Sequence, residues 1–290
     1  PFCGKPEHFY ISKDTQLWDC KRCGENGNIY KLLNFLDKLY LLKDGVTVKR
    51  RDLLLSIEQF NEKNYEDTVV NELPAIKMPA GWKVFANNDY LENRGVTTLE
   101  MKRYNIGGTN LFKKFNNYIL MPVIENKKVR GFVGRYGAKK VPKELKRYKN
   151  NDGFSSSELL YGIDEVIEGK TKTVILVEGI FDKISVDRFL NLWEDDEIKC
   201  LCTFGKKISD VQIKKIYNKK VQNVVLLYDF DAVREIKKYG IELERYFFTS
   251  ITFTNKKDID ECTEDEALEV FNSLMKPKEF NLNIIGKIKS

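Results

Sequence analysis

The chain has 290 residues, of which 32% are charged and 42% hydrophobic, and its formal net charge is +6. This composition supplies enough apolar side chains for a folded core, so it excludes disordered, collagen-like and coiled-coil proteins. No run of about 18–20 apolar residues predicts a membrane span, and no basic and apolar leader predicts export. A length of this order suggests about two domains.

Half of the six cysteines lie near the start of the sequence. Cys20 and Cys23 form a C-x₂-C pair, and sixteen residues separate Cys3 from Cys20. This spacing is typical of a zinc ribbon. The other cysteines have the pattern of structural residues, and nothing indicates a disulfide framework, so a reducing cytoplasm is expected. These remaining cysteines are Cys200, Cys202 and Cys262.

The positive charge is concentrated in residues 101–150, which contain fourteen lysines and arginines but only two acids. Aromatic side chains are interleaved with the basic ones. Phosphates pair with basic groups and bases stack on rings, so this mixture indicates a surface for a nucleic-acid strand. A solvated basic face is the alternative. A membrane surface is disfavoured because no basic amphipathic helix is present.

The expected elements fall into two groups along the chain. Apolar spacing predicts a helix over 28–43, a polar linker near 59–81, short helices between 82 and 107, and a hairpin over 117–136. From residue 171, buried strands alternate with helices, which predicts a parallel sheet flanked by helices. The expected strands are 172–179, 198–204, 223–232 and 250–254, and the helices are 180–193, 209–219 and 233–247.

Acidic residues follow three of these four strands. The carboxyl ends of parallel strands share one edge of a sheet, so we expect the acids to gather there. Gathered carboxylates raise one another's pKa unless cations neutralise them, and oxygen ligands suit two Mg²⁺ ions, for which Mn²⁺ can substitute. Each acid group alone could instead cap a helix. The groups are Glu178 with Asp182, Asp229 with Asp231, and Asp258 with Asp260.

These three acidic motifs, with Gly205 after the second strand, resemble the Toprim domain of bacterial-type primases, topoisomerases and some nucleases. Three upstream stretches resemble the polymerase core of DnaG-like bacterial and phage primases, and they occur in the family's order. They are YLENRGVT at 90–97, MPVIENKKVRGFVGR at 121–135 and KRYKNNDGF at 146–154. The resemblance implies an α/β fold (α+β overall) with an N-terminal zinc ribbon, a mixed α/β polymerase subdomain and a Toprim domain whose central parallel sheet is flanked by helices.

The resemblance also implies the domain boundaries. They are a template-binding zinc ribbon at 1–55, a linker at 56–81, a basic subdomain of the RNA polymerase core at 82–170, a Toprim catalytic subdomain at 171–265, and a short tail at 266–290. That tail is too short for the helicase-docking domain of bacterial primases. The ribbon is expected to hold one structural Zn²⁺ through Cys3, Cys20 and Cys23. Its fourth ligand is expected to be a cysteine just before Pro1, with His8 as the alternative.

The implied activity is that of a DNA primase, a nucleotidyltransferase that makes short RNA primers on single-stranded DNA from ribonucleoside triphosphates during replication. A Toprim nuclease and a catalytically silent DNA-binding accessory are the alternatives. The implied catalytic residues are Glu178, Asp182, Asp229 and Asp231. The implied Mg²⁺ ligands are Glu178, Asp229, Asp231, Asp258 and Asp260. The implied nucleic-acid or nucleotide contacts are Arg135, Arg147, Lys149, Lys139, Lys140 and Lys143.

One position departs from the family pattern. Bacterial primases usually carry a lysine shortly after the segment at 146–154, where this chain has Ser155-Ser156-Ser157. Lys149 or Lys146 is the expected replacement. The family further implies a monomer without membrane attachment that works with a replicative helicase in a primosome, in the cytoplasm of a bacterium or of a phage-infected cell.

Overall fold

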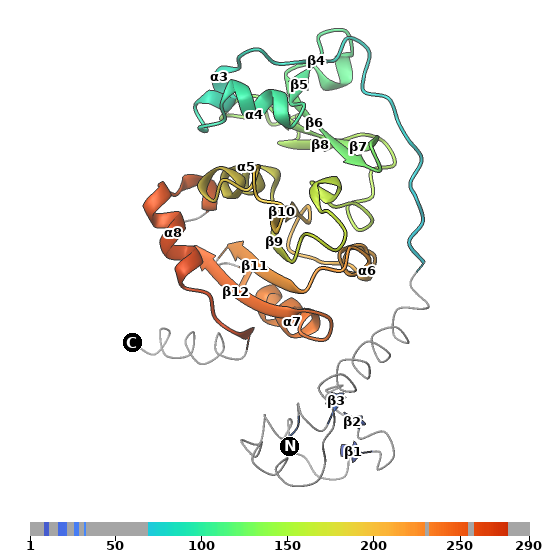
Figure 1. The fold of residues 1–290 in the computed structure, drawn as a ribbon. Coiled ribbons are helices and arrows are strands. Elements are labelled where there is room, and N and C mark those ends of the chain that lie inside the picture. Colours follow the sequence, from blue (N-terminus) through green and yellow to red (C-terminus); the bar gives the residue numbers. More distant parts are fainter. Residues whose placement is uncertain are drawn as a thin grey trace. The chain divides into compact units, whose positions relative to one another are not determined.

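The computed structural model describes residues 9–11, 17–21, 26–28, 32, 69–229, 232–254 and 258–277. The chain divides into two compact units, residues 1–62 and 63–290, and each is described by itself. Figure 1 shows that the second unit contains two sheets. We call residues 69–154 the antiparallel lobe and residues 155–277 the parallel lobe.

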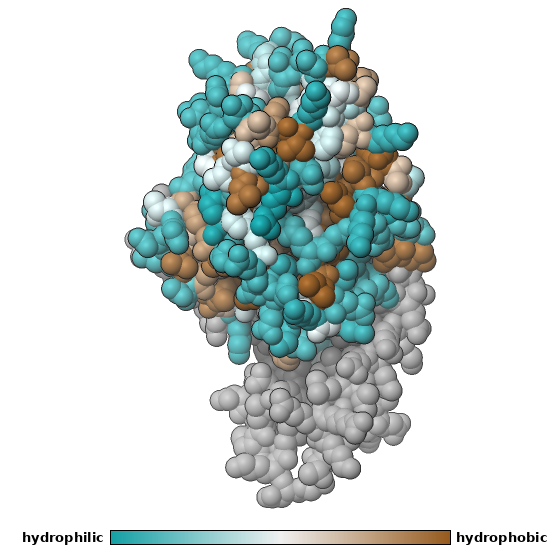
Figure 2. All heavy atoms as spheres, turned by 45° about the horizontal axis from the view of Figure 1, so that its top comes forward, coloured by the Kyte–Doolittle hydropathy of each residue, from teal (hydrophilic) through white to brown (hydrophobic). Residues whose placement is uncertain are grey.

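Polar residues cover most of the face shown in Figure 2, and apolar residues appear there in small scattered groups. Within the part of the chain that the structure describes, no helix is both long enough and apolar enough to cross a bilayer.

The first unit contains a small antiparallel sheet of β1 (Phe9–Ile11), β2 (Leu17–Cys20) and β3 (Asn26–Asn28), in that order. Trp18 and Cys20 are buried in it, and the rings of Phe9 and Trp18 lie 5.4 Å apart. The expected zinc site lies mostly outside the described residues, which omit Cys3, His8 and Cys23. Of the helix expected at 28–43, only Asn28, which belongs to β3, and Leu32 are described.

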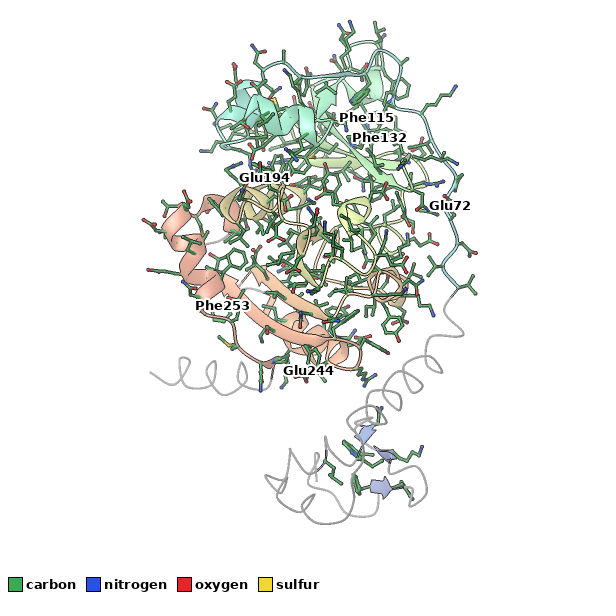
Figure 3. All side chains as sticks on the ribbon, viewed as in Figure 1. Glu72, Phe115, Phe132, Glu194, Glu244 and Phe253 are labelled. Carbon is green, nitrogen blue, oxygen red and sulfur yellow. The ribbon has the colours of Figure 1, made fainter. Side chains whose placement is uncertain are left out.

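The antiparallel lobe is built on five strands in the order β4-β5-β6-β7-β8. The strands are β4 (Lys83–Val84), β5 (Gly107–Gly108), β6 (Tyr118–Glu125), β7 (Lys128–Tyr136) and β8 (Tyr148–Asn150). Two short helices, α3 (Asp89–Glu92) and α4 (Thr98–Arg103), precede the central hairpin. Phe115 and Phe132 meet edge to face at 5.0 Å in its small core (Figure 3).

The hairpin predicted at 117–136 is present as β6 and β7. Its two-residue turn is formed by Asn126 and Lys127, which have φ angles of 54° and 58°. Two successive left-handed residues give the turn whose twist matches that of paired strands. The backbone N–H groups of Asn126 and Lys127 donate to the two carboxylate oxygens of Asp164 at 2.8 and 2.7 Å. This Asp164 clamp joins the turn to the parallel lobe.

Part of the expected linker packs on the antiparallel lobe. The N–H of Ile76 donates to the carbonyl of Val129 at 2.8 Å. The buried guanidinium of Arg130 donates to the carbonyl of Leu73 and pairs with Glu72. Residues 72–76 therefore lie alongside β7.

The parallel lobe contains the predicted parallel sheet, in the order β10-β9-β11-β12. Its strands are β9 (Thr173–Val177), β10 (Ile198–Cys202), β11 (Asn223–Asp229) and β12 (Phe248–Thr254). Its helices are α5 (Ile180–Phe189), α6 (Asp210–Asn218), α7 (Val233–Leu243) and α8 (Glu264–Asn272).

Alternating strand residues divide the core of this lobe into two layers. Ile175 and Val177 face α5 and α8, whereas Val174 and Leu176 face α6 and α7. Helix α5 ends at Phe189, before the expected residue 193, and Asn191 has a φ of 50°. Helix α7 likewise ends at Leu243 rather than near 247.

Helix α8 lies across the expected boundary between the Toprim subdomain, which ends at residue 265, and the tail, which begins at residue 266. Ala267 and Val270 are buried beside β12, and Thr252 donates to the carbonyl of Val270 at 2.7 Å. The packed part of the lobe therefore continues beyond that position.

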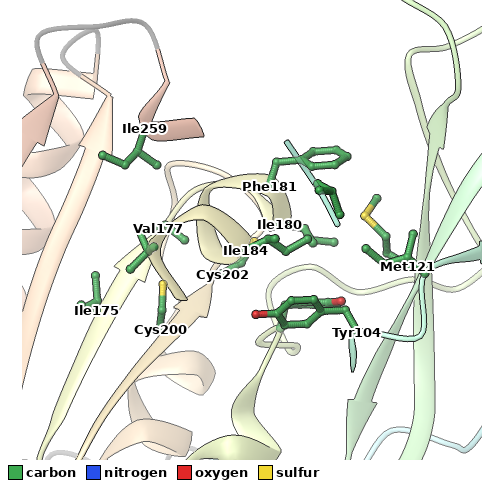
Figure 4. Packing of buried hydrophobic residues seen from close by; sticks show 14 of the residues in the cluster. Tyr104, Met121, Ile175, Val177, Ile180, Phe181, Ile184, Cys200, Cys202 and Ile259 are labelled. Atoms are coloured by element: carbon green, nitrogen blue, oxygen red, sulfur yellow. The ribbon is translucent and has the colours of Figure 1, made fainter. Parts of the chain in front are cut away.

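Helix α5 lies between the two sheets and is buried on most of its surface. Ile180 and Ile184 lie between Val177 of β9 and Met121 and Tyr104 of the antiparallel lobe (Figure 4). The helix therefore belongs to the cores of both lobes.

Several polar groups of α5 are buried in this position and form an ionic network. The Lys183 ammonium is fully buried and donates to Glu165 at 2.9 Å and to Asp187. Tyr104, from the antiparallel lobe, donates to Asp187 at 2.5 Å and accepts from Trp193 at 2.8 Å. Buried charges are tolerated only when they are paired and hydrogen-bonded.

We expect Lys183→Met to lower the free energy of unfolding by about 3–5 kcal/mol, because it leaves the buried carboxylate of Asp187 without a counter-charge. Urea unfolding measures the change. Lys170→Met is the matched control, since Lys170 pairs with Asp196 at the surface, and it should leave the free energy of unfolding nearly unchanged. Equal losses in the two variants would contradict this role.

Candidate active site at the edge of the parallel sheet

Three neighbouring strands bring acidic residues to one edge of the parallel sheet. Glu178 directly follows β9, Asp229 ends β11, and Asp258 lies four residues after β12. Strand β11 pairs in parallel with both β9 and β12, so the three positions share the same edge. Asp231 lies outside the described residues.

These acids line a cavity of about 430 Å³, which we call the acidic cavity. Both lobes contribute to it: β10, β11, α5 and the segments after β9, β10 and β12 come from the parallel lobe, and Arg94, β6, β7 and β8 from the antiparallel lobe. Its charged lining residues are Glu178, Asp182, Asp229, Asp258 and Arg94. The lining therefore carries more carboxylates than cationic groups.

Asp182 lies in the first turn of α5, and its carboxylate accepts the N–H of Gly179 at 2.9 Å. Burial raises the pKa of Asp182 well above its usual value, and repulsion from Asp260, Asp229 and Asp258 raises it further. Four carboxylates from three segments are thus close enough to act on one another, and the site favours a bound cation.

Arg94 brings a positive charge to these acids from the antiparallel lobe. Its guanidinium pairs with Asp260 and lies over the ring of Phe181 at 4.3 Å. Burial alone would lower the pKa of Arg94, but the hydrogen bond and charge of Asp260 outweigh burial and raise it. Our reading of the sequence missed this residue, although it lies in the YLENRGVT stretch.

Arg135 is almost fully buried on β7, with a relative exposure of 4%. Its guanidinium lies 4.9 Å from the ring of Tyr148, which lines the acidic cavity, and 5.6 Å from that of Tyr90. Among the described residues, its Nε and Nη1 atoms have no hydrogen-bond partner. These donors are available to an anionic ligand.

The other basic residues of the sequence prediction lie elsewhere. Tyr148 and Asn150 line the acidic cavity, but Lys149 between them points to the other side of β8. The Lys149 ammonium donates to the carbonyl of Lys114 at 3.0 Å and lies 5.6 Å from the ring of Phe115. The remaining basic residues are exposed between β7 and β8, and they are Lys139, Lys140, Lys143, Lys146 and Arg147.

The lining has the chemistry of a Mg²⁺ site, because carboxylate oxygens outnumber cations and repel one another. Within the part of the chain that the structure describes, no three acidic, histidine or cysteine side chains are grouped closely enough to hold a metal ion. The expected ligand Asp231 is outside that part.

Comparison with known proteins adds a second line of argument. No protein-family model matches the chain. A DNA primase of Clostridium acetobutylicum is 24% identical over 93% of this chain and 52% of its own length. A DNA primase of Halalkalibacterium halodurans is 23% identical over 80% of this chain and 45% of its own length. The chain thus spans about half the length of the curated relatives that it matches.

Solved structures show the same fold. A DnaG primase catalytic domain bound to single-stranded DNA aligns with a TM-score of 0.54 and 16% identity, over 70% of this chain and 78% of that domain. The Escherichia coli primase catalytic core aligns with a TM-score of 0.51 and 18% identity, over 68% of this chain and 75% of that core.

The chain is similar in sequence to bacterial DNA primases. Its second unit has the fold of a DnaG primase catalytic core, so the predicted α/β fold and the resemblance to DnaG-like primases are confirmed for that unit, whereas the predicted zinc ribbon lies mostly outside the described residues. In this DnaG-like core, the acidic cavity lies where the two lobes meet.

Asp182→Asn tests the cost of burying this carboxylate beside the other acids. The pKa of Asp182 is raised in the folded protein, so the unfolded chain loses this proton at a lower pH than the folded protein does. The folded state therefore loses stability as the pH rises from the pKa of the unfolded chain towards the pKa of the folded protein. Without divalent cations, we expect the variant to be more stable than the parent at pH 7, with the difference vanishing below about pH 4.

Thermal unfolding in a chelator between pH 4 and 8 measures this difference. The control is Asp196→Asn, because Lys170 lowers the pKa of this surface carboxyl, so its loss should have a small effect of opposite sign. An Asp182→Asn variant that is less stable than the parent at every pH would contradict this cost of burial and repulsion.

Proposed function

We propose that this chain is a DNA-dependent RNA primase that joins ribonucleotides on a single-stranded DNA template. The acidic cavity is the observation that carries the proposal, because it combines carboxylates from three strand ends with arginine-bearing elements of the other lobe. The primase relatives favour this activity over a Toprim nuclease or a silent DNA-binding accessory.

Glu178, Asp229, Asp231, Asp258 and Asp260 would hold magnesium ions, for which Mn²⁺ could substitute, and the bound cations would supply positive charge for the triphosphate during nucleotidyl transfer. The chain's own groups position these ligands. Asp182 binds the N–H of Gly179 and so fixes the turn that carries Glu178. Arg94 holds Asp260 at the cavity, and Arg135 offers two donors to a phosphate oxygen.

The partners proposed for this core are single-stranded DNA and ribonucleoside triphosphates. The exposed lysines between β7 and β8 suit the phosphates of the template strand. A zinc ribbon with Cys3, Cys20 and Cys23 as ligands is proposed to bind the template, with the fourth ligand as expected from the resemblance. We also propose that the protein is a monomer and that it works with a replicative helicase in a bacterial or phage-infected cell.

Removing one carboxylate from the acidic cavity tests the catalytic site. We expect Glu178→Gln or Asp229→Asn to reduce labelled RNA synthesis on single-stranded DNA by at least about 100-fold, because nucleotidyl transfer depends on the charge held there. Template affinity, measured by fluorescence anisotropy, should stay within about twofold since other residues hold most of the phosphates.

The matched control is Asp196→Asn, a surface carboxylate paired with Lys170, which should leave synthesis unchanged. Cleavage of the template without any RNA product by the parent would instead identify a nuclease. Full synthesis by the two cavity variants would rule out this site.

The exposed lysines can be tested by neutralising three of them together. The variant Lys139→Gln/Lys140→Gln/Lys143→Gln should bind single-stranded DNA more weakly and reduce the slope of log affinity against log salt by about two units, since each contact contributes about 0.7. Anisotropy titrations at several salt concentrations measure this slope.

The control Lys170→Gln/Lys172→Gln/Lys220→Gln removes the same charge from surface pairs of the parallel lobe. It should leave the slope near that of the parent. Equal slopes in all three proteins would remove the lysines between β7 and β8 from the DNA interface.

A further inference from the structure

A second cavity of the parallel lobe lies beside the acidic cavity and has the opposite charge. It has a volume of about 430 Å³, and we call it the lysine pocket. Its lining includes two basic and several hydroxyl side chains, and no acid is among the described residues that form it. The polar lining residues used below are Ser156, Ser157, Lys206, Lys207 and Ser209.

The lysine pocket is formed where the serine segment, Ser155-Ser156-Ser157, meets the loop after β10. This is the segment in which bacterial primases usually carry a lysine. The rings of Phe154 and Phe204 meet edge to face at 5.3 Å. The buried side chain of Gln212 donates to the carbonyls of Ser156 at 3.0 Å and Leu159 at 2.8 Å. The Ser209 hydroxyl donates to the carbonyl of Ser157. The serine segment is therefore held directly against the loop that carries Lys206 and Lys207.

The same loop joins the lysine pocket to the acidic cavity. Phe204 and Gly205 line both cavities. The N–H of Gly205 donates to the carbonyl of Glu178 at 2.9 Å, and Thr203 donates to the carbonyl of Val177 at 3.0 Å. Gly205 has a φ of +130°, which disfavours any residue with a side chain. The loop is thus fixed to the backbone of a proposed metal ligand.

The two cavities differ in charge, so they suit different parts of a ligand. The acidic cavity repels an anion unless cations are bound, whereas Lys206 and Lys207 attract one. Lysine ammonium groups and serine hydroxyls are common donors to phosphate oxygens. A ligand that reaches both cavities would therefore place an extended polyanion in the lysine pocket and its metal-dependent group in the acidic cavity.

We propose that the lysine pocket binds the β- and γ-phosphates of the incoming ribonucleoside triphosphate. This inference rests on the proposed function. Lys206 and Lys207 supply, from the loop after β10, the positive charge that the family usually places in the segment occupied here by Ser155-Ser156-Ser157. Of the two replacements expected from the sequence, Lys149 lies on the other face of β8, and Lys146 is exposed between β7 and β8.

The test compares Lys206→Ala/Lys207→Ala with the parent by isothermal titration calorimetry. The probes are ATP and inorganic tripolyphosphate, each with Mg²⁺, and anisotropy measures the affinity for a single-stranded oligonucleotide. We expect the affinities for ATP and tripolyphosphate to fall together by roughly tenfold, because charge-assisted contacts to the tail are lost. Oligonucleotide affinity should stay within about twofold.

Two further variants control for charge and structure. Lys206→Arg/Lys207→Arg keeps both charges and should retain most of the affinity for tripolyphosphate. Lys172→Ala removes one charge from the opposite end of β9, where Lys172 pairs with Glu197 at the surface, and should bind both probes like the parent. Thermal unfolding of each variant shows whether its fold is retained.

The inference is overturned if the double alanine variant keeps its affinity for both probes, loses affinity for ATP but not for tripolyphosphate, or loses affinity for the oligonucleotide alone. It is also overturned if the parent binds neither probe. Since binding needs no synthesis, a parent that binds both probes through these lysines but makes no RNA refutes the proposed function only. Synthesis with an unchanged KM for ATP in the double alanine variant refutes this inference only.

Discussion

The structure depends on the neutralisation of charges that are buried on α5. This helix is enclosed by both sheets, so its polar side chains cannot be solvated by water and must find partners in the protein. Lys183 and Asp187 pair with each other, and Glu165 and Tyr104 complete the network from either side of the helix. The same helix begins just after Glu178 and carries Asp182. The ionic network therefore also fixes the position of the acidic cavity.

The two lobes contribute opposite charges where they meet. The parallel lobe supplies carboxylates at strand ends, and the antiparallel lobe supplies Arg94 and Arg135. Neither set is balanced by itself: Asp182 has a raised pKa, and Arg135 has buried donors without partners among the described residues. A metal-bound nucleotide contains both cations and phosphate anions. Its cations would neutralise the carboxylates, and its phosphates would accept hydrogen bonds from the arginine.

The sequence alone predicts those parts of the fold that depend on local pattern. Apolar runs that end in acids predicted β9, β11 and the sheet edge that they share. The turn at Asn126 predicted the hairpin. Features set by distant contacts were missed. Arg94 pairs with Asp260, 166 positions away, and no local pattern indicates such a pair. The direction of Lys149 follows from the pairing register of β8, which the sequence does not specify.

Helix lengths show the same limit. Apolar spacing extends α5 to residue 193, but the chain leaves the helix at Phe189, and Trp193 then reaches back to Tyr104. Apolar spacing does not encode this contact between distant residues. The lysine pocket likewise could not be foreseen, because it needs Ser156 and Lys207 to line one cavity, although they are about fifty residues apart in the chain.

The Asp164 clamp on the hairpin turn limits how the lobes can move. One carboxylate of the parallel lobe holds two successive backbone amides of the antiparallel lobe, and α5 is packed into both. A hinge motion that separated the lobes would break both hydrogen bonds and expose the shared core at once. The acidic cavity is therefore expected to keep its shape when a ligand binds, because the two lobes that line it are held together by contacts outside the cavity.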